Sequence, residues 1–185
     1  MRLNKSILAG ILIGLGCWMF LSVDNSIVGA ILFSCGLLTI RLLKLNLYTG
    51  KVQYILQLKI SFLDYIIFLI GNLIGILIVF LICEKTLSIN KLIEISNIKS
   101  SQTFIQAIIK GIGCGILMSI ATYKDTPLWI TSLCVIAFIL CGFNHCIADF
   151  FYMLSNFHYN WFGTLIGNTL GGLIFSSYYL IKDEQ

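Results

Sequence analysis

The sequence predicts an all-α membrane protein with six transmembrane helices, and three observations support this fold class. Hydrophobic residues make up 58% of the 185-residue chain and charged residues only 11%, with a mean hydropathy of +0.96. Six apolar stretches approach or exceed the ~20 residues that a helix needs to cross a hydrocarbon core. A glycine-rich motif also recurs in the second half of the chain, which indicates an internal repeat.

The apolar stretches leave little of the chain for a soluble domain or a linker. We therefore expect a single polytopic membrane domain over residues 1–185. The first stretch follows Arg2 and Lys5, as a signal peptide would, but no small-residue cleavage site follows it, so we expect it to persist as the first helix. The predicted spans are residues 6–23, 26–46, 62–83, 103–123, 128–154 and 160–181.

Basic residues gather at one side of these spans. The positive-inside rule then places both termini in the cytoplasm, in a multi-pass protein of the cytoplasmic membrane. The formal charge of +4 reflects this topology and does not indicate a nucleic-acid partner. The residues on the predicted cytoplasmic side are Arg2, Lys5, Arg41, Lys44, Lys51, Lys59, Lys124 and Lys182.

The most unusual stretch is residues 142–149, where a glycine, an amide, an imidazole and a carboxylate interrupt an apolar run. His145 would lie near mid-depth in the membrane, where ionisable side chains are costly and usually mark a substrate or proton pathway. A histidine bonded to a neighbouring helix and involved only in packing is the alternative.

A second interruption is predicted in the first half of the chain. Residues 26–60 are too long for one straight span, and the apolar pattern lapses at an Asn and a Thr-Gly pair. Non-helical backbone at membrane depth must be buried in protein or line a cavity. We therefore expect residues 45–50 and 142–146 to be non-helical and to face a pathway.

The internal repeat connects these two interruptions. Residues 69–78 and 165–174 share seven of ten aligned positions at an offset of 96, and the same offset carries Thr49 onto His145. Because three spans per half is an odd number, the second half enters the membrane inverted, which brings the interruptions together. The predicted halves are about residues 6–83 and 103–181.

A metal or redox site is the chemical alternative, because thiolates and imidazole are ordinary zinc ligands. Cys141, His145 and Cys146 are close in sequence, but no second cluster accompanies them. The seven cysteines lie within or at the ends of apolar runs, where a free thiol behaves as a small hydrophobe. We expect no disulfide framework, no metal and no cofactor.

Three motifs follow one another along nearly the whole chain. They are Leu47-Tyr48-Thr49-Gly50, residues 142–149 (GFNHCIAD) and residues 167–172 (GNTLGG). In this order they resemble the Leu-Phe-Thr-Gly, Gly-Phe-Glu-His-x-x-Ala-Asn and Gly-Asn-x-x-Gly-Gly motifs of the formate/nitrite transporter family, whose relatives also carry hydrosulfide and lactate. The resemblance implies an aquaporin-like fold, a homopentamer in the bilayer and one pore per subunit.

The resemblance also assigns residues to roles. It implies that His145 is the central pore histidine, with Thr49 beside it and Asn144 next to it in the pathway. It places Phe33 and Leu47 at a cytoplasmic constriction, Phe138 at a periplasmic one, and Lys99 near the outer vestibule.

Several positions depart from the family pattern. Asn144 stands where the family has an acidic residue, and Asp149 stands where it has Asn. Asn46 replaces another acidic residue, Gly115 replaces a pore asparagine, and Lys44 stands where a glycine is expected. Lys44 and Lys110, which lies within the fourth span, are two extra cations that would raise the potential near the path or extend to its edges.

We expect a channel or secondary transporter for a small monovalent weak-acid anion, either formate, nitrite or hydrosulfide, and not an enzyme. An anion that enters an apolar constriction loses hydration and takes up a proton, exchanged with His145. Thr49 would hold a substrate oxygen or orient the imidazole, and Lys99 would gather anions from outside. A degenerate family member that acts as a structural or regulatory membrane partner is the alternative, motivated by Asn144, Asp149, Asn46 and Gly115.

Overall fold

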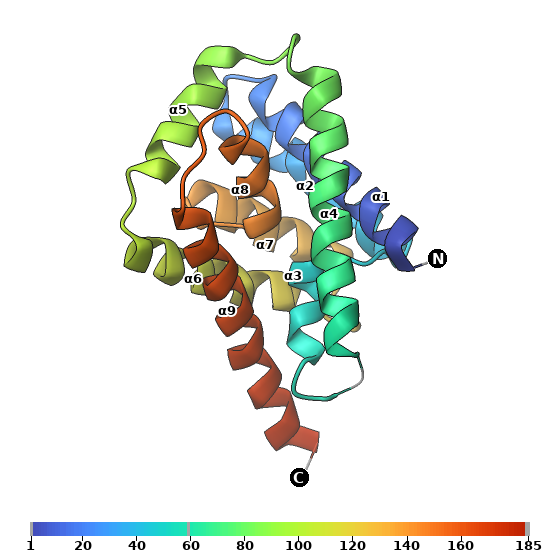
Figure 1. The fold of residues 1–185 in the computed structure, drawn as a ribbon. Helices are drawn as coiled ribbons and strands as arrows, with labels where there is room; N and C mark the ends of the chain where they lie inside the picture. Colours follow the sequence, from blue (N-terminus) through green and yellow to red (C-terminus); the bar gives the residue numbers. More distant parts are fainter. Residues whose placement is uncertain (1, 59, 184–185) are drawn as a thin grey trace.

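The protein folds into a bundle of helices, with two short helices inside it (Figure 1). The computed structural model describes residues 2–58 and 60–183, with side chains to residue 178, and all regular structure within them is helical. Lys59 lies outside these residues, as does the side chain of Lys182. The elements are α1 (Arg2–Leu21), α2 (Ser26–Leu42), α3 (Tyr48–Lys51), the 3-10 helix η1 (Val52–Tyr54), α4 (Phe62–Cys83), α5 (Ile89–Ser100), α6 (Phe104–Thr122), α7 (Leu128–Leu140), α8 (Cys146–Met153) and α9 (Asn160–Asp183).

Two pairs of long helices, α1 with α4 and α6 with α9, pack backbone to backbone. A Cβ atom on Gly10 of α1 would lie 2.1 Å from the carbonyl oxygen of Asn72 in α4. A Cβ atom on Gly115 of α6 would likewise lie 2.5 Å from the carbonyl oxygen of Asn168 in α9. Only glycine allows so close an approach, so Gly115 has a packing role. The matching contacts of Gly10 and Gly115 indicate that the two halves build the same kind of helix pair.

The helices that precede the interruptions, α2 and α7, end in the same way. The Leu45 amide donates to the Ile40 carbonyl (3.0 Å), and the Phe143 amide donates to the Phe138 carbonyl (2.9 Å). These bonds span five residues, as in a Schellman motif, which needs a left-handed residue after the helix. Gly142 supplies it with φ = 65° and Lys44 with φ = 51°, which explains why glycine is expected at position 44.

The interruptions lie earlier in the chain than the sequence predicts. Residues 43–47 and 141–145 are non-helical. Tyr48, Thr49 and Gly50 belong to α3, and Cys146 begins α8, so the prediction of non-helical backbone at these four positions was wrong. The physical reason is that a new helix starts as soon as an asparagine from a long helix binds its first backbone amide, as described below.

The repeat also has a different register from the predicted one. Lys44 and Gly142 are 98 positions apart, whereas Asn72 and Asn168 are 96 apart. The N-caps Leu47 of α3 and His145 of α8 share the larger offset. Thr49 and His145 are therefore not equivalent positions, because the chain between the short helix and the asparagine is two residues shorter in the second half.

Helix α5 was not predicted from the sequence, which reads as a polar loop. In Figure 1 it runs along the side of the bundle between α4 and α6, and it packs against α8. Lys99 lies in its last turn, with a side chain only 12% exposed. Its side chain is therefore largely buried within the protein.

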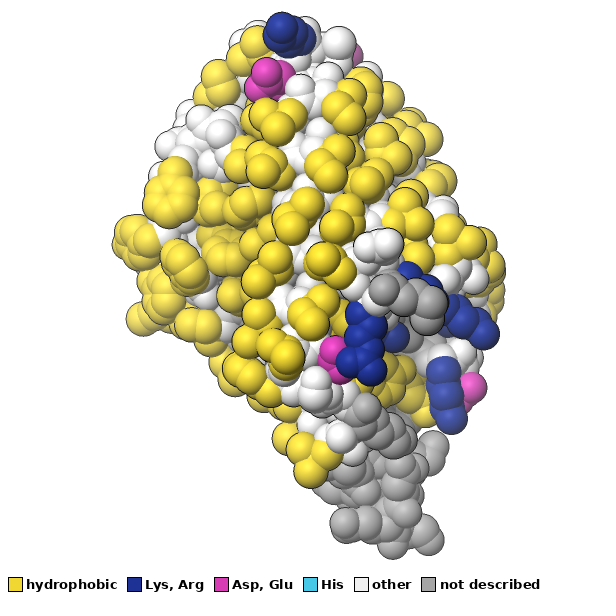
Figure 2. Space-filling view, turned by 45° about the vertical axis from the view of Figure 1, so that its right-hand side comes forward, with side chains coloured by type: hydrophobic (Ala, Val, Ile, Leu, Met, Phe, Trp, Pro, Cys, Tyr) yellow, Lys and Arg dark blue, Asp and Glu magenta, His cyan; other side chains and the backbone are white. Residues whose placement is uncertain are grey.

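Much of the outer surface is apolar. Figure 2 shows one face covered mostly by hydrophobic side chains, with most of its Lys and Arg gathered towards the lower right. Among the described residues, α1, α4 and α6 are long and apolar enough to cross a membrane, and α2 and α7 are shorter apolar helices. The protein is thus a multi-pass membrane protein. The exposed apolar residues of α4 include Ile66, Ile70, Ile74, Leu77, Ile78, Leu81 and Ile82.

Candidate functional site

Thr49 and His145 meet inside the protein, as the sequence predicts. Thr49 Oγ1 lies 2.9 Å from His145 Nε2, and the two residues are 2% and 1% exposed. Thr49 lies on α3, while His145 is the N-cap of α8. The beginnings of the two short helices therefore converge at this contact.

The hydrogen bonds of His145 select one tautomer of its ring. Its Nδ1 accepts a bond from the backbone amide of Ala148 (3.2 Å), which caps α8. An accepting Nδ1 carries no proton, so in the neutral ring the proton lies on Nε2, which donates to Thr49 Oγ1. The imidazole can become a cation here only if it gives up its bond to Ala148.

Aromatic side chains cover one face of the imidazole. The ring of Phe138 stacks on His145 with centroids 5.6 Å apart and an interplanar angle of 19°. Phe33 meets Phe138 edge to face at 6.0 Å. Both phenylalanines and His145 line a cavity of about 220 Å³, here named the aromatic cavity. It is lined by Phe20, Phe33, Ile95, Ile98, Lys99, Gln102, Lys110, Phe138, Ile139, Gly142, Phe143, His145, Ala148, Asp149 and Tyr152.

Phe33 therefore lies beside Phe138 and not across His145 from it. The predicted grouping of Phe33 with Leu47 was wrong in this respect, because the contact between the two rings puts them in one wall. Lys110 lines the same cavity, so this extra cation does lie near the candidate path.

Leu47 borders a second cavity of about 460 Å³, here named the basic cavity. Leu47 and Gly50, which flank Thr49 in sequence, line it, whereas His145 lines the aromatic cavity. The bond between Thr49 and His145 thus lies between the two cavities. The residues around the basic cavity are Ile40, Arg41, Lys44, Leu45, Leu47, Gly50, Lys51, Tyr54, Thr122 and Lys124, with no carboxylate among them.

Two buried asparagines hold the interrupted segments in place. The Asn72 amide group donates to the carbonyls of Ser6 (2.7 Å) and Asn46 (2.9 Å) and accepts from the Tyr48 backbone amide (2.8 Å). The Asn46 carbonyl and the Tyr48 amide lie at the interruption, where no helix satisfies them, whereas the Ser6 carbonyl lies within α1 and ties the segment to that helix. The sequence shows this asparagine only as part of a repeated motif, and its role as a clamp was missed.

Asn168 makes the same three kinds of bond in the second half. It donates to the carbonyls of Gly111 (2.9 Å) and Asn144 (2.8 Å) and accepts from the Cys146 backbone amide (2.8 Å). The indole of Trp161 adds a bond to the Cys146 carbonyl (2.7 Å). The start of α8 is therefore fixed from α9, on both sides of His145.

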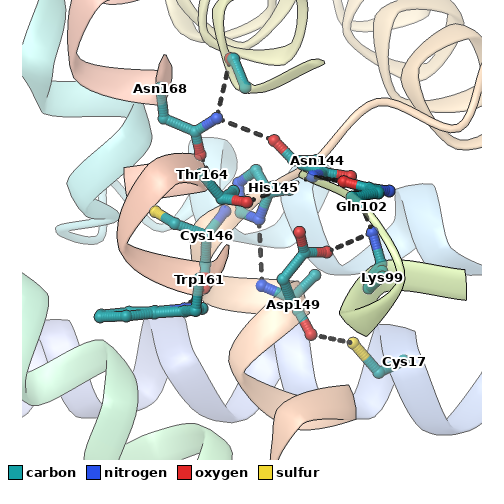
Figure 3. Close-up of polar contacts among 12 residues, drawn as sticks. Cys17, Lys99, Gln102, Asn144, His145, Cys146, Asp149, Trp161, Thr164 and Asn168 are labelled. Atoms are coloured by element: carbon teal, nitrogen blue, oxygen red, sulfur yellow. Dashed lines mark hydrogen bonds and ion pairs between the residues drawn. The ribbon is translucent and has the colours of Figure 1, made fainter. Parts of the chain in front are cut away.

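The polar residues next to His145 form one network (Figure 3). Lys99 Nζ lies 2.7 Å from Asp149 Oδ1 and donates to Asn144 Oδ1 at 3.2 Å. The Asn144 side-chain nitrogen donates to Gln102 Oε1 (2.7 Å) and Thr164 Oγ1 (3.2 Å). The predicted residues Lys99, Asn144, Thr49 and His145 are thus brought together, and Asp149 joins them as the counter-charge.

The cysteines near His145 do not form a metal site with it. Cys141 is exposed at the end of α7, while Cys146 is buried at the start of α8. Among the described residues, no group of three His, Cys, Asp or Glu side chains is placed to hold a metal ion. The arrangement around His145 is therefore one for hydrogen bonding and charge.

Comparison with known proteins gives consistent matches over the whole fold. The family model described as formate/nitrite transporter matches residues 2–182. The "Uncharacterized transporter YrhG" of Bacillus subtilis (strain 168) is 25% identical over an alignment of 186 positions that covers 82% of this chain and 69% of the relative. Among solved structures, a "Pentameric formate channel with formate bound" has a TM-score of 0.79 at 20% identity, over 100% of this chain and 97% of that one. An "FNT family ion channel" has a TM-score of 0.80 at 21% identity, over 97% and 89% of the two chains.

The clamp formed by Asn168 gives a stability prediction. Asn168→Ala leaves two buried backbone groups, the Asn144 carbonyl and the Cys146 amide, without the partner that the side chain supplies, and we expect a loss of at least about 2 kcal/mol. Asn156→Ala removes an exposed amide of the same type, with one bond to Asn97, and is expected to stay within about 0.5 kcal/mol. Thermal unfolding of both variants in detergent measures the difference. Equal melting temperatures would contradict the clamp.

Proposed function

Since the chain belongs to the formate/nitrite transporter family, we propose that it is a membrane channel or secondary transporter for a small monovalent weak-acid anion. Formate, nitrite and hydrosulfide are the proposed substrates. The observation that carries the proposal is the buried bond between His145, which lines the aromatic cavity, and Thr49, whose two sequence neighbours in the broken segment include Gly50 of the basic cavity. The solved channel titled as having formate bound, which shares the fold, supports this substrate class.

The proposed architecture is a single domain, residues 1–185, with six spans in an inverted 3+3 repeat of aquaporin-like form. In it, α2 with α3 and α7 with α8 are the broken second and fifth spans. The matching asparagine clamps and helix endings of the two halves support this arrangement. A homopentamer is the proposed assembly, by analogy with the neighbour titled pentameric. Both termini are proposed to face the cytoplasm, with the basic cavity on that side.

Two apolar constrictions would flank His145 in this pathway. Phe33 and Phe138 form one, on the side of the aromatic cavity, and Leu47 forms the other, beside the basic cavity. All three side chains are buried, at 3%, 4% and 1% exposure. An anion between them loses its hydration, which disfavours the charged form and raises the pKa of the corresponding acid. The anion therefore takes up a proton and crosses as the neutral acid.

His145 is the proposed site of proton exchange with that acid. The neutral ring carries its proton on Nε2 and first takes up a second proton at Nδ1, which requires the bond from the Ala148 amide to open. The resulting imidazolium can pass its Nε2 proton to a substrate oxygen, either directly in place of the threonine hydroxyl or through it, and the ring then returns to its neutral form. The imidazole therefore has two states: a neutral ring whose Nδ1 caps α8, and a charged ring that no longer caps it.

The alternative, a degenerate member that acts as a structural or regulatory partner, is weakened by the bonding of the substituted positions. Asn144 and Asp149 both contact Lys99, so they complete the polar network beside His145. Gly115 packs against Asn168, which holds the start of α8. The Asn46 bond to Asn72 uses the backbone carbonyl and does not depend on the side chain at that position. We favour transport because of the first three residues.

Flux measurements test the proposed function. Liposomes that contain the purified protein should take up formate, nitrite or hydrosulfide down a concentration gradient. They should exclude larger anions such as gluconate. Counterflow between pairs of these anions ranks them. Protein-free liposomes and liposomes with an unrelated helical membrane protein are the controls. No flux of any of the three by assembled protein would reject the proposal in favour of the structural partner.

Phe138→Ala tests the aromatic constriction. Removing the ring opens the wall beside His145, and we expect flux of anions larger than formate to rise by about tenfold as the apolar barrier is lost. Phe62→Ala is the matched control, because that phenylalanine is 80% exposed at the start of α4. If size selectivity is the same in both variants, Phe138 is a packing residue.

His145→Asn tests proton exchange. Asparagine is a good N-cap, so its side-chain oxygen can replace Nδ1 as the acceptor for Ala148, and we expect the variant to fold and assemble. It cannot titrate, so we expect proton movement to disappear and any residual flux to lose its dependence on pH. His158→Asn, which changes the other histidine of the chain, should keep both.

The measurement is proton-coupled uptake per assembled oligomer, followed with an internal pH dye. Proton uptake by His145→Asn equal to that of the wild type would rule out the exchange role. Loss of assembly with unchanged coupling in the remaining protein would show a packing histidine instead.

A further inference from the structure

We infer that Asp149 sets how tightly the pathway holds an anion beside Lys99. This inference rests on the proposed function and adds to it a residue that governs affinity. It follows from where the carboxylate lies, in the wall of the aromatic cavity and in contact with the nearest lysine.

The pair of Lys99 and Asp149 is buried and close. The ammonium and carboxylate are 2.7 Å apart, with side chains 12% and 4% exposed. Both residues line the aromatic cavity together with His145. Water therefore screens this pair little, and each charge strongly affects what enters the cavity.

The backbone fixes the carboxylate in this place. Asp149 lies in the first turn of α8, and its amide donates to the His145 carbonyl at 2.7 Å. Lys99 reaches it from the last turn of α5, which packs against α8. The carboxylate thus stays one helical turn from the imidazole, and it competes with any anion for the same ammonium.

This competition has a consequence for transport. A lysine ammonium in a desolvated cavity without a counter-charge would bind an anion tightly, and conduction requires an anion that can also leave. Asp149 cancels the charge of Lys99, so that the entering anion meets one positive charge fewer in a lining that also includes Lys110. The carboxylate weakens binding and speeds release.

Asn144 offers a way to move the counter-charge. Its Oδ1 already accepts a bond from Lys99 Nζ at 3.2 Å, so an aspartate there would place a carboxylate oxygen at almost the same point. Asn144 also donates to Gln102 and Thr164. Rotation of the Gln102 amide and of the Thr164 hydroxyl would turn both into donors for a carboxylate.

The test is a charge series at these two positions. Asp149→Asn keeps an oxygen for Lys99 but leaves its charge uncancelled. Asn144→Asp adds a second carboxylate, and the double variant with both changes restores one carboxylate at the other position. The readout is the concentration dependence of formate and nitrite flux in liposomes, per assembled oligomer, with Glu84→Gln as an exposed charge control.

We expect the half-saturating anion concentration to rise with the number of carboxylates beside Lys99. It should fall about tenfold in Asp149→Asn, together with the maximal flux, and rise about tenfold in Asn144→Asp. The double variant and Glu84→Gln should resemble the wild type. The inference is supported if the half-saturating concentration of the double variant lies between those of the two single variants.

Other outcomes overturn it. An unchanged or raised half-saturating concentration in Asp149→Asn would mean that the carboxylate does not compete for Lys99. If that variant fails to assemble, a half-saturating concentration in Asn144→Asp equal to that of the wild type would overturn the inference alone. Absence of flux in the wild type rejects the proposed function itself, which is a different result.

Discussion

The structure depends on hydrogen-bond partners for the backbone N–H and C=O groups of the two segments that are not helical inside the bundle. In each half, one buried asparagine bonds the chain just before a short helix and the first amide of that helix. Glycines on α1 and α6 bring a neighbouring helix within reach, so that the same asparagine also bonds a carbonyl there. Because no water is present to replace such bonds in a hydrocarbon core, close packing and the interruptions require each other.

The two halves use this common frame for different purposes. Leu47 begins α3 without a side-chain cap, and it presents an apolar side chain to the basic cavity. His145, at the matching position, caps α8 through Nδ1 and turns Nε2 towards Thr49. The pseudo-symmetric frame therefore places an apolar residue against one cavity and an ionisable one against the other. The asymmetry comes from side chains and not from the backbone.

The sequence predicted an all-helical membrane protein, the existence of both interruptions and the meeting of Thr49 with His145. Apolar length and the lapses in the apolar pattern report the first two directly, whereas the third was reached through a 96-residue offset that does not make the two positions equivalent. The sequence-based prediction ended the second span at residue 46 instead of Leu42, since a lysine occupies the left-handed position where a glycine would have marked the end. It missed α5, whose polar composition resembles a loop. It named Lys99 and Asp149 separately but could not pair them, because their contact depends on the packing of α5 against α8.

The departures from the family motifs make physical sense only when they are considered together. An amide at 144 next to a buried lysine would leave that lysine without a counter-charge, which is costly in a dry site. A carboxylate at 149 beside an apolar wall would be equally costly alone. Lys99 contacts both positions, at 3.2 and 2.7 Å, so a single carboxylate at either one neutralises it. The exchange of amide and acid between them therefore keeps Lys99 paired with one carboxylate, and neither residue can be judged without the other.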